Sequence, residues 1–347
     1  GMRVMASAMY AGAQTGSNPA EVLARATPHA FVVGENFAGM RSQALGLAHR
    51  AGWDGTFQPV CPSRVARVAL AGPRWLGRSC LRGSSGQALE THKDLLRADV
   101  VISIGGKGGA IGAALRAHHR PVVQIQNPRQ SLARFDLIIA CRHDDISGPN
   151  VLLGRTALHG LTPEELAHAK QEWEPRLAHL PRPLVAALVG GSNGRFQLGE
   201  AEARRLAHVL VQTRQDEGGS LIVTASRRTD PQALAALKEI IEPAGGFVWD
   251  GEGDNPYTGL IACADSLLVT IDSVSMMSES VAGRAPVTVF PLPGKSRRIN
   301  EFVEELELAG RVRVLGESAT RLPTPWHVTP LDDTAELVGE MHSRLGF

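Results

Sequence analysis

Short runs of apolar, often β-branched residues alternate with amphipathic stretches along most of the chain. In the first half, the short apolar runs predict strands and the amphipathic stretches between them predict helices. The strands are expected at 30–33, 99–104, 121–126 and 136–140, and the helices at 41–50 and 109–118. This alternation is typical of βα units, which build parallel sheets. Residues 62–90 show no clear period, so we expect an irregular insertion there.

A second series follows a helix predicted at 162–177, where a Thr-Pro pair marks the start. Its strands are expected at 184–189, 220–225, 247–249, 266–271 and 286–290, and its helices at 200–215, 231–241, 256–264, 274–283, 300–309 and 332–345. Two similar halves joined near residue 181 predict an α/β protein of two Rossmann-like parallel-sheet domains that face a central cleft. The predicted divisions are a loose tail over 1–29, domains over 30–181 and 182–330, and a terminal segment over 331–347.

The composition describes an ordinary globular protein and excludes several functional classes. The chain has 347 residues with 36 Lys and Arg against 35 Asp and Glu, and no basic stripe dense enough to indicate nucleic-acid binding. Its four cysteines are scattered without a CxxC pair, which disfavours a zinc site or disulfide framework and fits a reducing cytoplasm. No apolar run approaches the roughly 20 residues that span a bilayer, and the N-terminal stretch lacks the apolar centre of a signal peptide.

In open parallel sheets, ligands bind beyond the carboxyl ends of the strands. Four loops in such positions in the second half carry glycines, arginines or acids, and each could also be a plain turn or solvated loop. Paired glycines let backbone N–H groups approach a ligand, and adjacent arginines suit an anion. The candidate nucleotide-binding residues in these loops are Gly190, Gly191, Ser192, Asn193 and Arg195, then Ser226, Arg227 and Arg228, then Trp249, Asp250, Asn255, Pro256 and Tyr257, and finally Pro291, Gly294 and Lys295. We expect Thr229 or Asp230 to cap the helix that begins at Pro231.

The stretch DSVSMMSES, from Asp272 to Ser280, joins an apolar strand to a helix and is the strongest candidate. Ser273 or Ser275 can cap the helix, whose free N–H groups and positive dipole end suit a phosphate. Glu279 lies one turn after Ser275 on the same helix face and outside a capping box, so it is free to accept hydrogen bonds from ribose hydroxyls. A helix that is merely well capped would explain one serine only.

The first half has matching loops with fewer charges. GENFAGMRSQ follows the first strand, and GGKGGA follows another strand and opens a helix without a complete dinucleotide fingerprint. We expect these loops on the acceptor side, with Glu35, Asn36, Arg41, Gln43, Gly106 and Lys107 as candidates. The loop CRHDD supplies His143 and Asp144 as candidate acid–base groups, or is simply a polar loop.

Several segments together closely resemble the mitochondrial-fission (elongate-mitochondria) family and its bacterial relatives. These are SQALGLA, FDLIIACRHD, TASRRT and the long run from FVWDGEGDNPY through DSVSMMSES to FPLPG, and the likeness covers roughly residues 30–345 and is densest over 220–294. The resemblance implies a GT-B architecture in which the C-terminal domain holds a donor nucleotide and the terminal helix packs back on the first domain. It further implies that Ser273, Val274 and Ser275 receive the diphosphate and Glu279 the ribose. Arg142 departs from the acidic residue of the bacterial members.

The resemblance implies a glycosyltransferase that moves a sugar from a nucleoside diphosphate sugar to an acceptor such as a lipid-linked or cell-envelope glycan. We expect no metal and no cofactor beyond this donor, because arginines, Lys295 and a helix dipole can stabilise the leaving diphosphate. A sugar-nucleotide epimerase of the same fold and a non-catalytic nucleotide-binding scaffold are the alternatives. The expected location is the cytoplasm, with peripheral contact at the inner face of the membrane.

Overall fold

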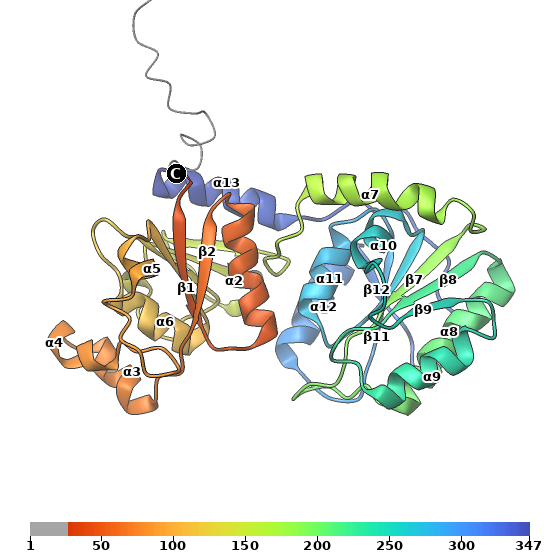
Figure 1. The fold of residues 1–347 in the computed structure, drawn as a ribbon, viewed down its shortest axis with the longest axis horizontal. Helices are drawn as coiled ribbons and strands as arrows, with labels where there is room; N and C mark the ends of the chain where they lie inside the picture. Colours follow the sequence, from red (N-terminus) through yellow and green to blue (C-terminus); the bar gives the residue numbers. More distant parts are fainter. Residues whose placement is uncertain (1–26) are drawn as a thin grey trace, which may run out of the picture.

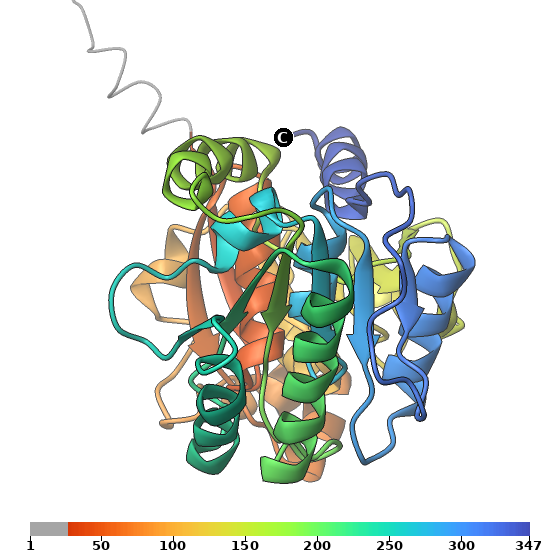
Figure 2. The ribbon, with the colours of Figure 1, turned by 90° about the vertical axis from the view of Figure 1, so that its right-hand side faces the viewer.

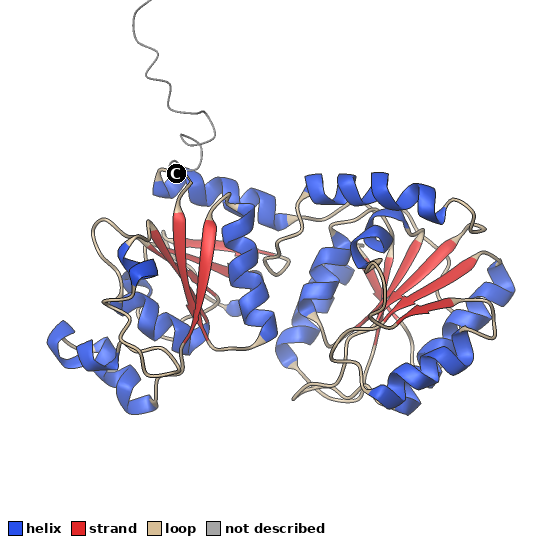
Figure 3. Ribbon diagram, viewed as in Figure 1, coloured by secondary structure: helices blue, strands red, loops and turns tan. Residues whose placement is uncertain are grey.

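The computed structural model describes residues 27–347 and contains two α/β domains side by side (Figures 1 and 3). Each domain is built on a six-stranded sheet, and all strand pairs in both sheets are parallel. The strand orders are β2-β1-β3-β4-β5-β6 and β12-β11-β10-β7-β8-β9. The predicted fold class is confirmed. Most of the tail predicted over 1–29 lies outside the described residues, and the first strand begins at His29.

The first sheet is formed by residues up to Gly154. Its elements are β1 (His29–Gly34), α2 (Ala38–Arg50), β2 (Asp54–Pro59), α3 (Arg64–Ala71), α4 (Arg74–Gly77), η1 (Arg78–Cys80), α5 (Lys93–Leu96), β3 (Val100–Ile104), α6 (Gly105–Ala114), β4 (Val122–Ile125), η2 (Leu132–Arg134), β5 (Leu137–Cys141), η3 (Arg142–Asp144) and β6 (Val151–Gly154). Separate clusters of buried side chains cover the two faces of this sheet. The segment 62–90, which we expected to be irregular, contains α3 and α4, so that prediction was wrong for its first half.

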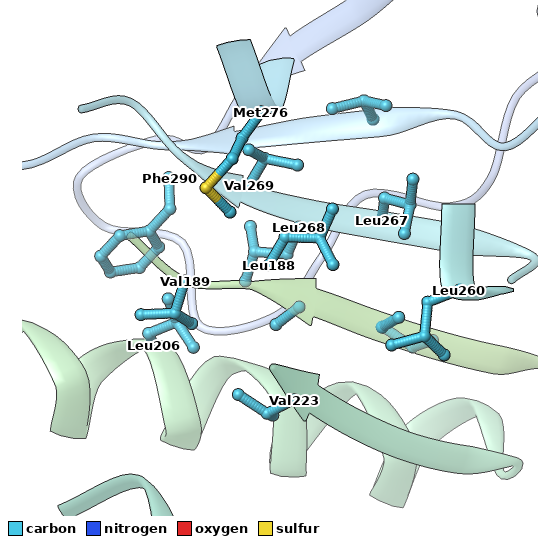
Figure 4. Packing of buried hydrophobic residues seen from close by; sticks show 14 of the residues in the cluster. Leu188, Val189, Leu206, Val223, Leu260, Leu267, Leu268, Val269, Met276 and Phe290 are labelled. Carbon is cyan, nitrogen blue, oxygen red and sulfur yellow. The ribbon is translucent and has the colours of Figure 1, made fainter. Parts of the chain in front are cut away.

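The second sheet follows a long helix. The remaining elements of the chain are α7 (Pro163–Leu177), β7 (Leu184–Leu188), α8 (Glu200–Glu217), β8 (Ser220–Thr224), α9 (Pro231–Ile241), β9 (Phe247–Trp249), α10 (Tyr257–Cys263), β10 (Ser266–Thr270), α11 (Val274–Val281), β11 (Val287–Phe290), α12 (Arg297–Leu308), β12 (Val312–Val314) and α13 (Asp333–Leu345). Figure 2 shows α8 and α9 in front of this sheet. Side chains of β7, β8, β10 and β11 form one core with α8, α10 and α11 (Figure 4).

Helix α7 begins with a capping box and packs on the second domain. The Thr162 hydroxyl accepts the N–H of Glu165 at 3.0 Å, and the Glu165 carboxylate accepts the N–H of Thr162 at 3.4 Å. A Cβ at Gly259 of α10 would lie 2.3 Å from the indole of Trp173, so α7 and α10 are in close contact. By packing, the second domain therefore includes a helix that precedes residue 181 in the chain.

Helix α13 returns to the first domain, where it packs on α2 and β6. Asp332, just before this helix, binds the buried Arg50 guanidinium at 2.7 Å, and Asp333 binds Arg155 at 2.8 Å. Burial of Leu337, Val338 and Met341 in the first core completes the attachment. Among the described residues, no helix is long and apolar enough to cross a membrane.

Candidate functional site

Gly190 and Gly191 follow β7 and lie against neighbouring loops too closely for any side chain. A Cβ at Gly190 would lie 2.1 Å from Oδ2 of Asp272, and one at Gly191 would lie 1.9 Å from the carbonyl oxygen of Arg228. The N–H of Gly190 donates to Thr270 at 2.9 Å, and that of Gly191 donates to Asp272 at 3.2 Å. The loops after β7, β8 and β10 are therefore held together, and only glycine fits at both positions.

Asp272 is a support for this loop rather than a free ligand group. Its side chain is buried, with Oδ2 occupied by the N–H of Gly191 and the Arg228 guanidinium 3.6 Å away. Oδ1 has no hydrogen-bond partner among the described residues. Burial raises the pKa of Asp272, although Thr270, Gly191 and Arg228 oppose the rise. The buried carboxylate thus acts through the backbone of the glycine loop.

The loop after β8 is fixed by Thr229. Its hydroxyl donates to the carbonyl oxygen of Gly190 at 2.6 Å and accepts the N–H of Ser226 at 2.9 Å. Asp230, one of the two predicted caps, is the N-cap residue of α9, but its side chain makes no cap hydrogen bond, and Thr229 is used between loops. Arg227 and Arg228 are exposed at this strand end and are placed to meet an anion.

Helix α11 begins directly beyond β10 and is capped by Ser273. The Ser273 hydroxyl accepts the N–H of Met276 at 3.2 Å, so Ser273, and not Ser275, is the cap. Val274, Ser275 and Glu279 are the partly exposed residues of its first two turns, whereas the methionines between them are buried. One face of α11 is therefore directed away from the core, and the first N–H groups of the helix have no acceptor within it.

Glu279 is partly buried, in contact with Tyr257 and within electrostatic reach of His159. The Tyr257 hydroxyl donates to its carboxylate at 3.3 Å. Burial raises the pKa of Glu279, while the charge of His159 and the Tyr257 hydroxyl lower it. Burial, together with the charge of Glu279, raises the pKa of Tyr257 well above its ordinary value. A carboxylate already held by one hydroxyl is suited to accept hydrogen bonds from others.

Residues of the loop after β9 either make structural contacts or line a cavity that the glycine loop does not line. Asp250 pairs with Lys238 of α9, and Asn255 accepts the N–H of Tyr257 at 3.0 Å. Pro256 is the buried residue before α10. The indole Nε1 of Trp249 is buried without a hydrogen-bond partner in the described chain, and the ring lines a cavity of about 410 Å³ beside α7. Tyr257, which begins α10 just beyond this loop, donates its hydroxyl hydrogen bond to Glu279.

The loop after β11 is joined to the loop after β7. Gly294 has a φ of +132°, and a Cβ there would lie 1.9 Å from the carbonyl oxygen of Arg195. The Arg195 guanidinium donates to Ser296 at 3.4 Å, and Asn193 accepts two backbone N–H groups of its own loop. The Ser192 hydroxyl likewise accepts the N–H of Leu198 at 2.9 Å. The polar side chains here shape the loop, which leaves Lys295 exposed at its tip beyond Pro291.

In the first domain, the candidates at the ends of β1 and β3 lie together. The Lys107 ammonium lies 3.9 Å from the Glu35 carboxylate and 3.7 Å from the Cys61 sulfur. Asn36 and Arg41 are exposed, and the Arg41 guanidinium lies over the ring of Phe57 at 5.1 Å. A Cβ at Gly106 would lie 3.0 Å from a guanidinium nitrogen of Arg67. The strand ends of the first domain thus carry a polar cluster that contains both positive and negative side chains.

The candidate acid–base loop lies at the domain interface. The Asp144 carboxylate accepts the N–H of Cys141 at 3.0 Å, and Asp144 lines a cavity of about 20 Å³ with Gln43 and, from the second domain, Arg298. Nε2 of His143 is buried and has no partner in the described residues. Arg142 crosses to Glu305 of α12 at 3.5 Å. One Asp144 oxygen is thus committed to the backbone turn.

A family model described as Mitochondrial fission ELM1 matches residues 38–345. The chain belongs to this family. Its relatives include the Mitochondrial fission protein ELM1 of Arabidopsis thaliana, 29% identical over 273 residues that cover 71% of this chain and 64% of that protein. An uncharacterized protein, RP120 of Rickettsia prowazekii (strain Madrid E), is 26% identical, with 68% and 77% covered. The ELM1-family chain thus spans less than two thirds of the Arabidopsis relative's length.

Solved structures show the same fold at low sequence identity. A Methanocaldococcus jannaschii UDP-GlcNAc 2-epimerase in complex with UDP-GlcNAc and UDP matches with a TM-score of 0.53 and 11% identity, over 92% of this chain and 99% of that one. The Neisseria meningitidis UDP-GlcNAc 2-epimerase bound to UDP-GlcNAc matches with a TM-score of 0.51 and 11% identity, over 92% and 100%. The ELM1-family chain therefore has the two-domain GT-B-like architecture that its sequence resemblance implied.

His159 is a residue of this ELM1-family site that sequence reasoning missed. It is 1% exposed; its Nδ1 accepts the N–H of Leu161 at 3.2 Å, and its Nε2 lies 3.4 Å from Asp332. It stands near Glu279 and links the start of the terminal helix to the candidate site. The only sequence signal was its place just before the capping box of α7, which says nothing about partners so distant along the chain.

Proposed function

We propose that this protein transfers a glycosyl group from a nucleoside diphosphate sugar to an acceptor. The observation that carries the proposal is the arrangement around α11. A capped helix start, a loop where only glycine fits and a carboxylate held by a tyrosine lie at neighbouring strand ends of one sheet. Family membership and the likeness in fold to sugar-nucleotide enzymes are consistent with it.

In this proposal the diphosphate binds at the N-terminus of α11. The first N–H groups of a helix have no acceptor within it, and the Ser273 hydroxyl uses only that of Met276. Val274 and Ser275 would therefore present free donors at the positive end of the dipole. Arg228 and Lys295 add positive charge from neighbouring loops, which favours the charge that develops on a leaving diphosphate.

The ribose would bind at Glu279. Its carboxylate lies on the same partly exposed helix face as Ser275, one turn further along. Tyr257 holds one carboxylate oxygen, so the other can accept from sugar hydroxyls. This division of labour predicts that Glu279 distinguishes a nucleotide from a bare diphosphate.

The acceptor would approach from the first domain. Lys107 and Glu35 lie together at its strand ends, and Asp144 lies at the interface with Arg298 opposite. We propose His143 or Asp144 as the base that takes the acceptor proton, with the hydrogen bond of Asp144 to Cys141 making His143 the better candidate of the two. The four cysteines of the chain are free thiols in the described residues, which fits the reducing cytoplasm that we propose as its location.

A thermal-shift comparison of UDP, GDP, ADP, CMP and TDP tests the proposal. A ligand at 100 times its dissociation constant adds about 2.7 kcal/mol to the free energy of unfolding. We expect at least one nucleoside diphosphate to raise the melting temperature. Incubating the donor sugar with and without acceptor then separates transfer from epimerisation, which needs no acceptor. If every nucleotide leaves the melting curve unmoved, the donor site is not where we place it.

A further inference from the structure

Helices α3 and α4 form a corner of the first domain that carries exposed apolar side chains. Val65 is 81% exposed, Val68 75% and Trp75 79%, and Leu76 is also exposed. Val65 and Val68 are three residues apart on α3, so they lie on one face of that helix. Helices α3 and α4 contact each other, which brings the four side chains onto one corner, residues 64–77. Figure 1 shows this α3–α4 corner projecting on the side away from the second domain.

The charged residues of the segment that carries the α3–α4 corner are all arginines. Residues 55–89 contain five arginines and no aspartate or glutamate. Arg78 is paired with Glu90 and Arg82 with backbone carbonyls, but the guanidinium groups of Arg64, Arg67 and Arg74 form no hydrogen bond or ion pair with the described chain. The exposed apolar tip is therefore flanked by two exposed, unpaired arginines, Arg64 and Arg74.

We infer that the α3–α4 corner docks this protein on an anionic lipid bilayer. Apolar side chains of an interfacial helix enter the headgroup boundary while flanking arginines meet anionic lipid, and tryptophan favours that depth. A protein partner could cover the valines and the tryptophan, but it would have to be acidic. A second copy of this chain would bring the unpaired arginines of one corner against those of the other, which disfavours self-association.

The corner adjoins the candidate acceptor side. Helix α3 contacts α6, and Arg67 on its inner side lies over Gly106 at the start of that helix. Lys107, the next residue of α6, contacts Glu35 and Cys61. Docking by the corner would therefore bring the polar cluster at the strand ends close to the lipid surface. This placement suits an acceptor carried on a lipid, and that consequence alone rests on the proposed function.

Co-sedimentation with vesicles tests the inference without any nucleotide. We expect the full chain to bind phosphatidylcholine vesicles containing about 30% phosphatidylglycerol, and to bind pure phosphatidylcholine much more weakly. Combined Val65→Ser, Val68→Ser and Trp75→Ser changes should abolish sedimentation. Arg64→Gln with Arg74→Gln should lower the affinity for anionic vesicles about fivefold for each arginine and flatten its salt dependence.

Matched controls separate docking from damage to the fold. Leu308→Ser removes an apolar side chain that is 86% exposed on another helix, and Arg97→Gln removes an exposed arginine of the same domain; neither should change vesicle binding. Trp75→Phe should still sediment but lose the blue shift in fluorescence that the wild type shows on anionic vesicles. Unchanged melting temperatures would confirm that the variants are folded.

Two results would overturn the inference. One is a wild-type protein that stays in solution with both vesicle types, or that binds them equally before and after the triple substitution. The other is a concentration-dependent dimer that the triple substitution dissociates while vesicle binding is absent, which would assign the corner to a second copy. Nucleotide binding would be unaffected by either result, so the donor-site proposal stands or falls separately.

Discussion

At the scale of single residues, the start of α11 separates a serine that supports the helix from one that is free for a ligand. Ser273 caps the helix through the N–H of Met276, whereas Ser275 makes no side-chain hydrogen bond with the described residues. Ser273→Ala should therefore lower the free energy of unfolding by about 1 kcal/mol, and Ser275→Ala should leave it nearly unchanged. Urea denaturation of both variants measures this. Equal losses would mean that both serines cap.

The sequence identifies these residues as candidates but does not show which of them support the fold and which are free to bind a ligand. The serines, Asp272 and Glu279 were all visible as polar positions at a strand end. Two of these roles depend on loops that approach from other strands. The buried Asp272 carboxylate accepts the N–H of Gly191, and the Thr229 hydroxyl donates to Gly190 and does not cap α9. A single sequence contains local signals for caps, but it has none for the partner of a side chain across a sheet.

At the scale of elements, the buried strands were predicted because apolar runs mark them. The edge strand β9 was also predicted, but the edge strands β2, β6 and β12 were missed. β2 has the sequence DGTFQP and is mostly exposed, and β12 has only three residues, of which two are exposed. Strands of this kind lack the alternation or apolar run that predicts a strand. Their presence follows from pairing with β1 and β11, which is a tertiary effect.

Helix α6 is an element whose glycines are required by packing. Its glycines lower its intrinsic helix propensity, yet a Cβ at Gly112 would lie 2.5 Å from Cβ of Ser103 in β3. Gly112→Ala should lower the free energy of unfolding by about 1–3 kcal/mol through overpacking. Gly339→Ala in α13 is the control, because nothing lies within 4 Å of the added methyl group, and it should raise stability by up to about 1 kcal/mol. Chemical denaturation of both variants measures these changes. If Gly112→Ala leaves the free energy of unfolding unchanged, the helix can move away from the sheet to make room for the methyl group.

At the scale of the whole molecule, a buried ion pair attaches the end of the second domain to the first. Arg50 and His159 hold the pKa of Asp332 at about 2 against the cost of its burial. Because this pKa lies below the ordinary value of the unfolded chain, the pair contributes stability above about pH 4, and the contribution is lost as the pH falls towards 2. The terminal helix therefore depends on this contact at neutral pH.

Asp332→Asn should lower the free energy of unfolding at pH 7 by about 2–3 kcal/mol. The difference from the wild type should shrink as the pH falls from 4 towards 2, since the wild-type carboxyl then gains a proton. Asp254→Asn, which removes an exposed partner of Arg176, should cost less than about 1 kcal/mol at any pH. Urea titrations at several pH values provide the measurement, and a loss that does not vary with pH would assign the effect to packing.

The central claim is that α11 binds the diphosphate at its start and the ribose at Glu279. Isothermal titration of wild type and Glu279→Gln, with the best nucleoside diphosphate from the thermal screen and with pyrophosphate, tests it most directly. Replacing the carboxylate should leave stability nearly unchanged, because the glutamine can still accept the Tyr257 hydrogen bond and partial burial disfavours the charge. We predict that Glu279→Gln weakens nucleotide binding by about 1–3 kcal/mol and barely alters pyrophosphate binding. Equal losses for both ligands, or no loss for either, would contradict the assignment of the ribose to Glu279.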